Sequence, residues 1–66
     1  MKVSYFDDTD TLYIELRSES VAETRDLDEQ TVLDVDAQGR VCGITVEHAS
    51  QRADLAHLFV EGLTAA

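Results

Sequence analysis

The sequence contains no proline, one cysteine and three glycines among its 66 residues. This scarcity of proline and glycine excludes a linker or a low-complexity segment, because such segments are rich in these residues. The single cysteine, Cys42, excludes a disulfide within the chain. A chain of this length has room for one hydrophobic core, so residues 1–66 are expected to form a single domain. Domains this small often supplement their core by oligomerising.

Long apolar runs are also absent, because the longest contain three residues, at 12–14 and 58–60. Neither run is long enough to span a bilayer. The first residues, from Met1 to Ser4, lead within a few positions into charged residues, which is not the pattern of a secretion signal. Together with the lone cysteine, this pattern predicts a cytoplasmic protein.

Basic residues are scarce: five Lys and Arg stand against 14 Asp and Glu, which gives a formal net charge of −9. Such a chain repels phosphate backbones and anionic membrane surfaces, so we expect neither a nucleic acid nor a membrane as partner. The same charge would attract a basic protein, in the way that an antitoxin binds a basic nuclease. It is also the charge of a surface that only keeps a small protein soluble.

Apolar and polar residues alternate through most of residues 1–47, which predicts about five short strands. Residues that share a face within their strands are Val3 and Tyr5, then Leu12, Ile14 and Leu16, then Leu33 and Val35, then Cys42, Ile44 and Val46. A weaker strand from Val21 to about Leu27 has little apolar content, which suits a sheet edge or a largely solvated position. Because short turns connect the strands, we expect sequential antiparallel pairing.

The periodicity changes at residues 49–50, where a helix over residues 51–62 is expected. Ser50 is a favourable N-cap, and Gly62 lies near the expected C-terminal end. One apolar stripe at helical spacing is formed by Leu55, Leu58, Phe59 and Leu63. The predicted fold class is therefore α+β: a small antiparallel β-meander packed with one C-terminal helix.

Residues 34–39 read Asp-Val-Asp-Ala-Gln-Gly, which matches the start of a calcium loop. The twelfth position should be Glu but is Thr45, and the flanks read as strands, so we interpret this segment as a hairpin connection with Gly39 at positive φ. A second acidic cluster lies near residue 8 and is typical of a turn. No metal site and no cofactor are predicted; the weak candidates for a metal site are Asp7, Asp8, Asp10, Asp34 and Asp36.

Residues suited to catalysis are few. Cys42 alternates with Ile44 and Val46, which predicts a buried, unreactive thiol. His48 and His57 have acidic neighbours, but their spacing matches no zinc pattern. No nucleophile with a base and an orienting group is recognisable, and we therefore predict that the protein is not an enzyme.

The remaining candidates are interaction residues. Tyr13, Val32 and Val41 fall on the face opposite the expected core, where they would form a small exposed apolar patch. Self-association through that patch or through a sheet edge would supply burial that a small domain lacks, which predicts a homodimer. A basic protein is the alternative partner, with Asp28 and Glu29 as candidate contacts. Weak binding of a divalent cation or small ligand by the Asp clusters is a further alternative.

A family likeness extends over roughly residues 1–50. The segments that carry it are residues 3–7, 10–16, 21–25, 34–44 and 49–50. In order and spacing they resemble a bacterial family of small proteins, domain of unknown function 2283. The resemblance implies a small, cytoplasmic, β-rich protein with no established activity. One departure is Thr45, where members often carry an acidic residue.

Overall fold

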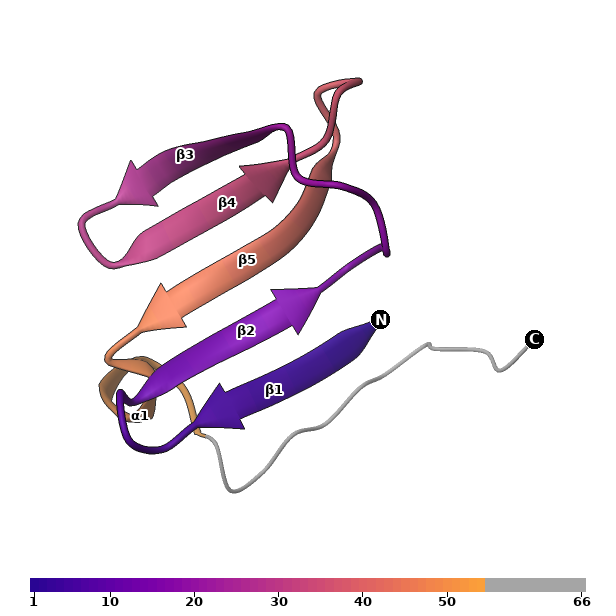
Figure 1. The fold of residues 1–66 in the computed structure, drawn as a ribbon. Helices are drawn as coiled ribbons and strands as arrows, with labels where there is room; N and C mark the ends of the chain where they lie inside the picture. The colour runs from indigo at the N-terminus through magenta and orange to yellow at the C-terminus, as the bar shows by residue number, and fades with distance from the viewer. Residues whose placement is uncertain (55–66) are drawn as a thin grey trace.

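The computed structural model describes residues 1–54, which form one five-stranded sheet and a short helix (Figure 1). The elements are β1 (Lys2–Phe6), β2 (Thr11–Glu15), β3 (Glu23–Asp28), β4 (Thr31–Val35), β5 (Val41–Glu47) and α1 (Ala49–Arg52). The predicted fold class, a small α+β domain with about five antiparallel strands and one helix, is confirmed. Within residues 1–54, no helix is long and apolar enough to cross a membrane.

The strands lie in the order β1-β2-β5-β4-β3, and all neighbours are antiparallel. The expected sequential pairing is therefore wrong at one point, because β2 pairs with β5 and not with β3. Residues 16–22 carry the chain from the end of β2 to the far edge of the sheet (Figure 1). The reason is the charge of β3, in which four of six residues are charged, so that this strand suits an edge. The predicted edge position of this strand is confirmed.

The register places the apolar side chains of four strands on one face. Ile14 pairs with Ile44, which pairs with Leu33, and Leu12 pairs with Val46. Residues directly opposite each other share a face, so the apolar face consists of Val3, Tyr5, Leu12, Ile14, Leu33, Ile44 and Val46. The opposite face carries Ser4, Tyr13, Thr24, Val32, Asp34, Gly43 and Thr45.

Few apolar side chains are fully buried among residues 1–54. Val35, Cys42 and Ala49 are buried, whereas the residues of the apolar face are half-buried or exposed. Backbone hydrogen bonds from Leu16 N to Cys42 O (2.9 Å) and from Ala22 N to Val35 O (2.9 Å) attach residues 16–22 to the sheet, at the end where Val35 and Cys42 lie. The predicted burial of Cys42 is confirmed.

The helix differs from the prediction. It begins at Ala49, its N-cap is His48 in the left-handed conformation, and it ends at Arg52, after which Ala53 is extended. Ser50 is not the N-cap, because its side chain is committed to a contact with Asp10. The remainder of the predicted helix, from residue 55, lies outside the described residues.

Candidate functional site

The outer edge of β1 is the most apolar sheet edge in the described part of the chain. Only Lys2 of its five residues is charged, and β1 is regular along its whole pairing with β2. The residues Val3, Tyr5 and Phe6 are 41%, 43% and 51% exposed. An edge strand of this kind presents unpaired backbone N–H and C=O groups beside apolar side chains, and such an edge accepts a further strand.

The other edge, β3, has features that prevent pairing. Glu23, Arg25, Asp26 and Asp28 are charged, and a β-bulge between Asp26 and Asp28 interrupts the register. The guanidinium of Arg25 bonds the carboxylate of Glu23 at 2.9 Å along the strand. Charges and bulges are the usual means by which sheet edges avoid association. The two edges of this sheet are therefore unequal, and within residues 1–54 β1 is the edge without such protection.

Asp10 joins the β1–β2 turn to α1. Its carboxylate accepts hydrogen bonds from the Tyr5 hydroxyl (2.6 Å), the Ser50 hydroxyl (2.7 Å) and the Ser50 backbone N–H (3.0 Å). Its backbone carbonyl accepts from Ala49 N at 2.9 Å, and its φ is positive at 53°. The Tyr5 hydroxyl bond, followed by the Ser50 hydroxyl bond, lowers the pKa of Asp10, and the same bond raises the pKa of Tyr5. Asp10 therefore acts as a structural anchor.

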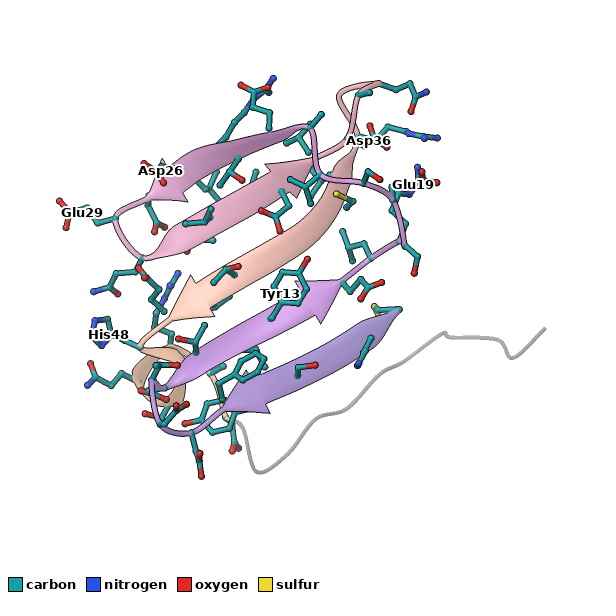
Figure 2. The ribbon with its side chains drawn as sticks, in the orientation of Figure 1. Tyr13, Glu19, Asp26, Glu29, Asp36 and His48 are labelled. Carbon is teal, nitrogen blue, oxygen red and sulfur yellow. The ribbon has the colours of Figure 1, made fainter. Side chains whose placement is uncertain are left out.

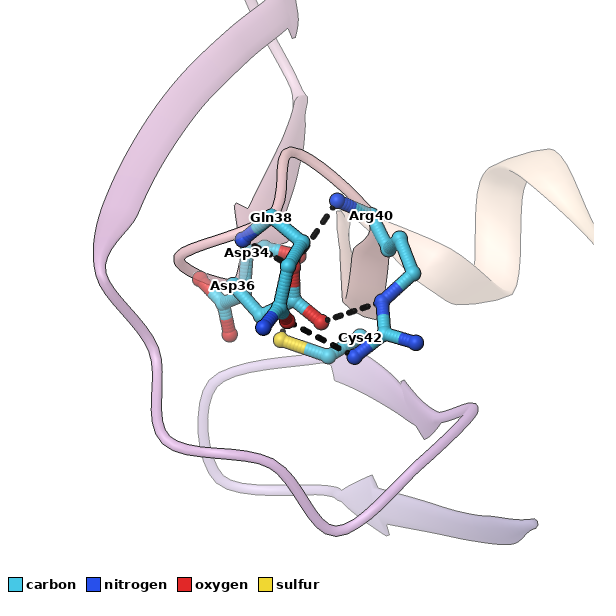
Figure 3. Close-up of polar contacts among 5 residues, drawn as sticks. All are labelled: Asp34, Asp36, Gln38, Arg40 and Cys42. Atoms are coloured by element: carbon cyan, nitrogen blue, oxygen red, sulfur yellow. Dashed lines mark hydrogen bonds and ion pairs between the residues drawn. The ribbon is translucent and has the colours of Figure 1, made fainter.

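Asp36 holds the β4–β5 turn (Figure 3). Its buried carboxylate accepts from Gln38 N, Arg40 N and Arg40 Nε, each at 2.9 Å. The backbone N–H of Arg40 is the main cause of the lowered pKa of Asp36. Gly39 has φ 81°, so the interpretation of this segment as a hairpin connection with positive φ at Gly39 is confirmed.

The five weak metal candidates are not gathered at one place. Asp10 and Asp36 are bonded in two different turns, and Asp34 lies on β4. Asp7 and Asp8 are exposed in the β1–β2 turn. Within residues 1–54, no group of three or more His, Cys, Asp or Glu side chains is arranged to hold a metal ion.

Tyr13 lies over β5 on the face turned to the viewer in Figure 2. Its hydroxyl donates to Asp34 Oδ2 at 3.1 Å, and Thr24 donates to the other oxygen of Asp34 at 3.3 Å. Gly43 allows this position, because a Cβ there would collide with the phenol ring and hydroxyl. Gly43 is therefore closely packed by Tyr13 of the neighbouring strand.

The interaction patch expected from the sequence is thus only partly available. The Tyr13 hydroxyl is engaged by Asp34, and both Tyr13 and Val32 are half-buried. Val41 is 37% exposed, near the start of β5. Tyr13 and Val32 lie opposite the apolar face, as the alternation in the sequence predicts, whereas the exposed edge residues Val3, Tyr5 and Phe6 were not predicted as a site. Their signal was the single charge in β1, compared with four in β3.

Asp28, at the end of β3, and Glu29, in the β3–β4 turn, are the candidates for a basic partner. Together with Gln30 and Arg52 they line a shallow depression of about 440 Å³. Arg52 donates to Gln30 O and to Thr31 Oγ1, both at 2.6 Å, and lies 3.9 Å from Asp28. The carboxylate of Asp28 accepts from Gln30 N at 2.8 Å, the main cause of its lowered pKa. This region is therefore largely occupied by contacts that attach α1 to the turn.

The acidic turns lie together because of the antiparallel topology. The β1–β2 turn, the β3–β4 turn and the end of β5 lie at the same end of the sheet, where Glu29 and His48 are labelled in Figure 2. Asp7, Asp8, Asp28 and Glu29 are all exposed there.

No curated protein and no solved structure matches this chain. A family model does match, over residues 2–50, and these residues include all five strands and the start of α1. The family is described as a protein of unknown function, DUF2283. The match covers well over half of the 66 residues and includes the β1 edge, the Asp10 anchor and the Asp36 turn. The resemblance seen in the sequence is thereby confirmed, and the chain belongs to the DUF2283 family.

Proposed function

We propose that this protein is a non-catalytic, self-associating interaction module in which two copies pair through their β1 edges. The observation that carries the proposal is the inequality of the two sheet edges, since β3 has the charges and the bulge that prevent pairing and β1 has neither feature beyond Lys2. An isologous dimer uses the same surface on both copies, and an antiparallel pair of identical strands meets this condition.

The sequence of β1 is compatible with pairing to itself. In an antiparallel pair centred on Ser4, Val3 lies opposite Tyr5 of the partner subunit, a β-branched residue beside an aromatic ring. Lys2 lies opposite Phe6 of the partner subunit and next to the start of the acidic β1–β2 turn. No like charges face each other, and the two apolar faces join into one.

A non-catalytic role is supported by the use of the polar side chains within residues 1–54. The carboxylates of Asp10, Asp28 and Asp36 accept hydrogen bonds in turns and at the start of α1. The thiol of Cys42 is buried and directed at Asp34 O, 3.3 Å away. These groups therefore stabilise turns and strand contacts of the fold.

The experiment compares Ser4→Lys with Thr24→Lys by light scattering at micromolar concentration. Both positions carry small hydroxyl side chains on the opposite face, one in β1 and one in β3, and both changes add one positive charge. We expect the unaltered chain to give twice its monomer mass, which is 7.3 kDa. Ser4→Lys should raise the dissociation constant by about tenfold or more, equivalent to about 1.4 kcal/mol, whereas Thr24→Lys should leave it unchanged.

A monomeric mass for the unaltered chain would contradict the proposal. If both variants weakened dimerisation equally, the cause would be a general effect of the added charge. If only Thr24→Lys weakened dimerisation, the contact between the two copies would lie at β3.

A basic protein remains a second candidate partner because the fold gathers Asp7, Asp8, Asp28 and Glu29 at one end of the sheet. Such a complex would depend on exposed charges and would therefore weaken with salt. This response to salt separates it from self-association.

A further inference from the structure

The apolar face lacks a covering layer among residues 1–54. Four strands contribute to it, and its residues are half-buried or exposed. The helix α1 has four residues and lies at one end of the sheet, so it leaves the middle of the face open (Figure 1). A sheet with one apolar face requires a second layer to bury that face.

The helix α1 is held by side chains that belong to this face of the sheet. The Tyr5 hydroxyl, which belongs to the apolar face, bonds Asp10, and Asp10 in turn bonds Ser50 of α1. At the other side of the helix, Arg52 donates to Thr31 Oγ1, and Thr31 shares the apolar face through its pairing with Val46. Both anchors of α1 therefore come from the apolar side.

The chain continues for 12 residues after Asp54, and their sequence suits this surface. Leu55, Leu58, Phe59 and Leu63 recur at helical spacing, whereas His57 and Glu61 fall between them. A helix over nine residues is about 13 Å long, and a strand of five residues spans about 17 Å. A helix about 10 Å wide covers about two strands, which is enough for the central pair β2 and β5.

We propose that the apolar face is the docking surface for residues 55–63 of the same chain, with Leu58 and Phe59 against β2 and β5. Three observations support this assignment: the segment follows directly after Asp54, both anchors of α1 come from the apolar face, and the length of the segment matches the strands. It is independent of the β1 edge, because it uses a face of the sheet and the dimer uses an edge.

Cross-linking tests which chain supplies the segment. In a Cys42→Ala background, Leu58→Cys is combined either with Ile44→Cys or with Thr45→Cys and treated with a short bis-maleimide. Ile44 and Thr45 are neighbours in β5, are both half-buried and face opposite sides of the sheet, so they form a matched pair. We expect a link within one chain for Ile44→Cys and none for Thr45→Cys. A link between chains, equal linking at both positions or no link at all would overturn the proposal.

Unfolding in urea provides an independent readout. Phe59→Ala should reduce the folding equilibrium constant by a factor on the order of several hundred, as truncation of a buried aromatic does, and should increase the binding of a hydrophobic dye. His57→Ala, which lies off the apolar stripe, should change neither. Equal effects of the two variants would overturn the assignment, and the cross-linking result stands even if Phe59→Ala fails to fold.

Discussion

At the scale of single residues, the pair Gly43 and Tyr13 determines how β2, β5 and β4 are joined on the opposite face. The Tyr13 ring lies over Gly43 and thereby reaches Asp34 on the next strand. Burial, followed by the bond to Asp34, raises the pKa of Tyr13 above its ordinary value of 10.0. Glycine at position 43 therefore makes room for the Tyr13 ring and is not needed for an unusual backbone conformation.

We therefore expect Gly43→Ala to destabilise the protein by about 1–3 kcal/mol, the usual cost of overpacking. The added methyl group would displace the Tyr13 ring and break its bond to Asp34. Urea unfolding of Gly43→Ala, Tyr13→Ala and the double variant would measure the coupling between the two residues. In the Tyr13→Ala background, the change at Gly43 should cost little, and a full cost there would refute the explanation.

The aspartates show which site residues are readable from sequence. Every partner of the Asp36 carboxylate lies within four residues, so the turn motif was visible as a local pattern. Asp34 is bonded by Tyr13 and Thr24, which belong to other strands. These contacts depend on the strand order, and no local pattern predicts them.

At the scale of secondary structure elements, two predictions were incompatible with each other. Alternation correctly located the strands, and the charges of β3 correctly indicated an edge. The third strand of a sequential five-stranded meander, however, lies in its centre. In the structure the more apolar β5 lies between β2 and β4 and takes the central position. A central strand pairs along both of its edges, whereas a charged strand such as β3 suits the edge of a sheet.

The start of α1 was misplaced for a related reason. Ser50 has the side chain of an N-cap, but Asp10 from a distant turn binds both its hydroxyl and its backbone N–H. His48, in the left-handed conformation, is the N-cap instead. A contact between residues 40 positions apart overrides the local capping preference.

The connection between the β1–β2 turn and α1 predicts a dependence of stability on pH. Hydrogen bonds from Tyr5 and Ser50 lower the pKa of Asp10 from its ordinary value of 3.8. The unfolded chain then binds more protons in this range, so the contribution of Asp10 is present above about pH 4 and is lost as the pH falls through the folded pKa. Asp10→Asn, which tolerates positive φ, should be less stable than the unaltered chain at pH 7.

Urea unfolding between about pH 7 and about pH 2.5 checks this prediction. The difference between Asp10→Asn and the unaltered chain should shrink as the pH falls. A residual dependence should persist in the variant, because the pKa values of Glu23, Asp28 and Asp36 are also lowered. A constant difference across the range would show that the Asp10 charge has no part in the anchor.

At the scale of the whole molecule, net charge opposes the association of two copies. Each chain carries a formal charge of −9, and the acidic turns concentrate part of it at one end of the sheet. Strand pairing, in contrast, relies on backbone hydrogen bonds and apolar contacts, which salt affects little. Screening should therefore relieve the repulsion and leave the pairing intact.

We accordingly expect the homodimer to become tighter when the ionic strength rises from about 0.01 M to about 0.15 M, as the Debye length falls from about 30 Å to about 8 Å. Sedimentation equilibrium at the two salt concentrations measures the dissociation constant. A complex with a basic protein would respond in the opposite direction. A homodimer that weakens with salt would indicate attraction between unlike charges as its main source.

The strand order also determines how the chain reaches its folded state. β1 with β2, and β3 with β4 and β5, form two units whose contacts are local, and residues 16–22 link them. Joining the units requires β2 to meet β5, which brings together residues as distant in the sequence as Thr11 and Glu47. The entropy cost of closing a long loop arises before its contacts can stabilise the chain. Such pairing is therefore slower than the formation of local contacts. We therefore expect the docking of the N-terminal hairpin onto β5 to limit the folding rate.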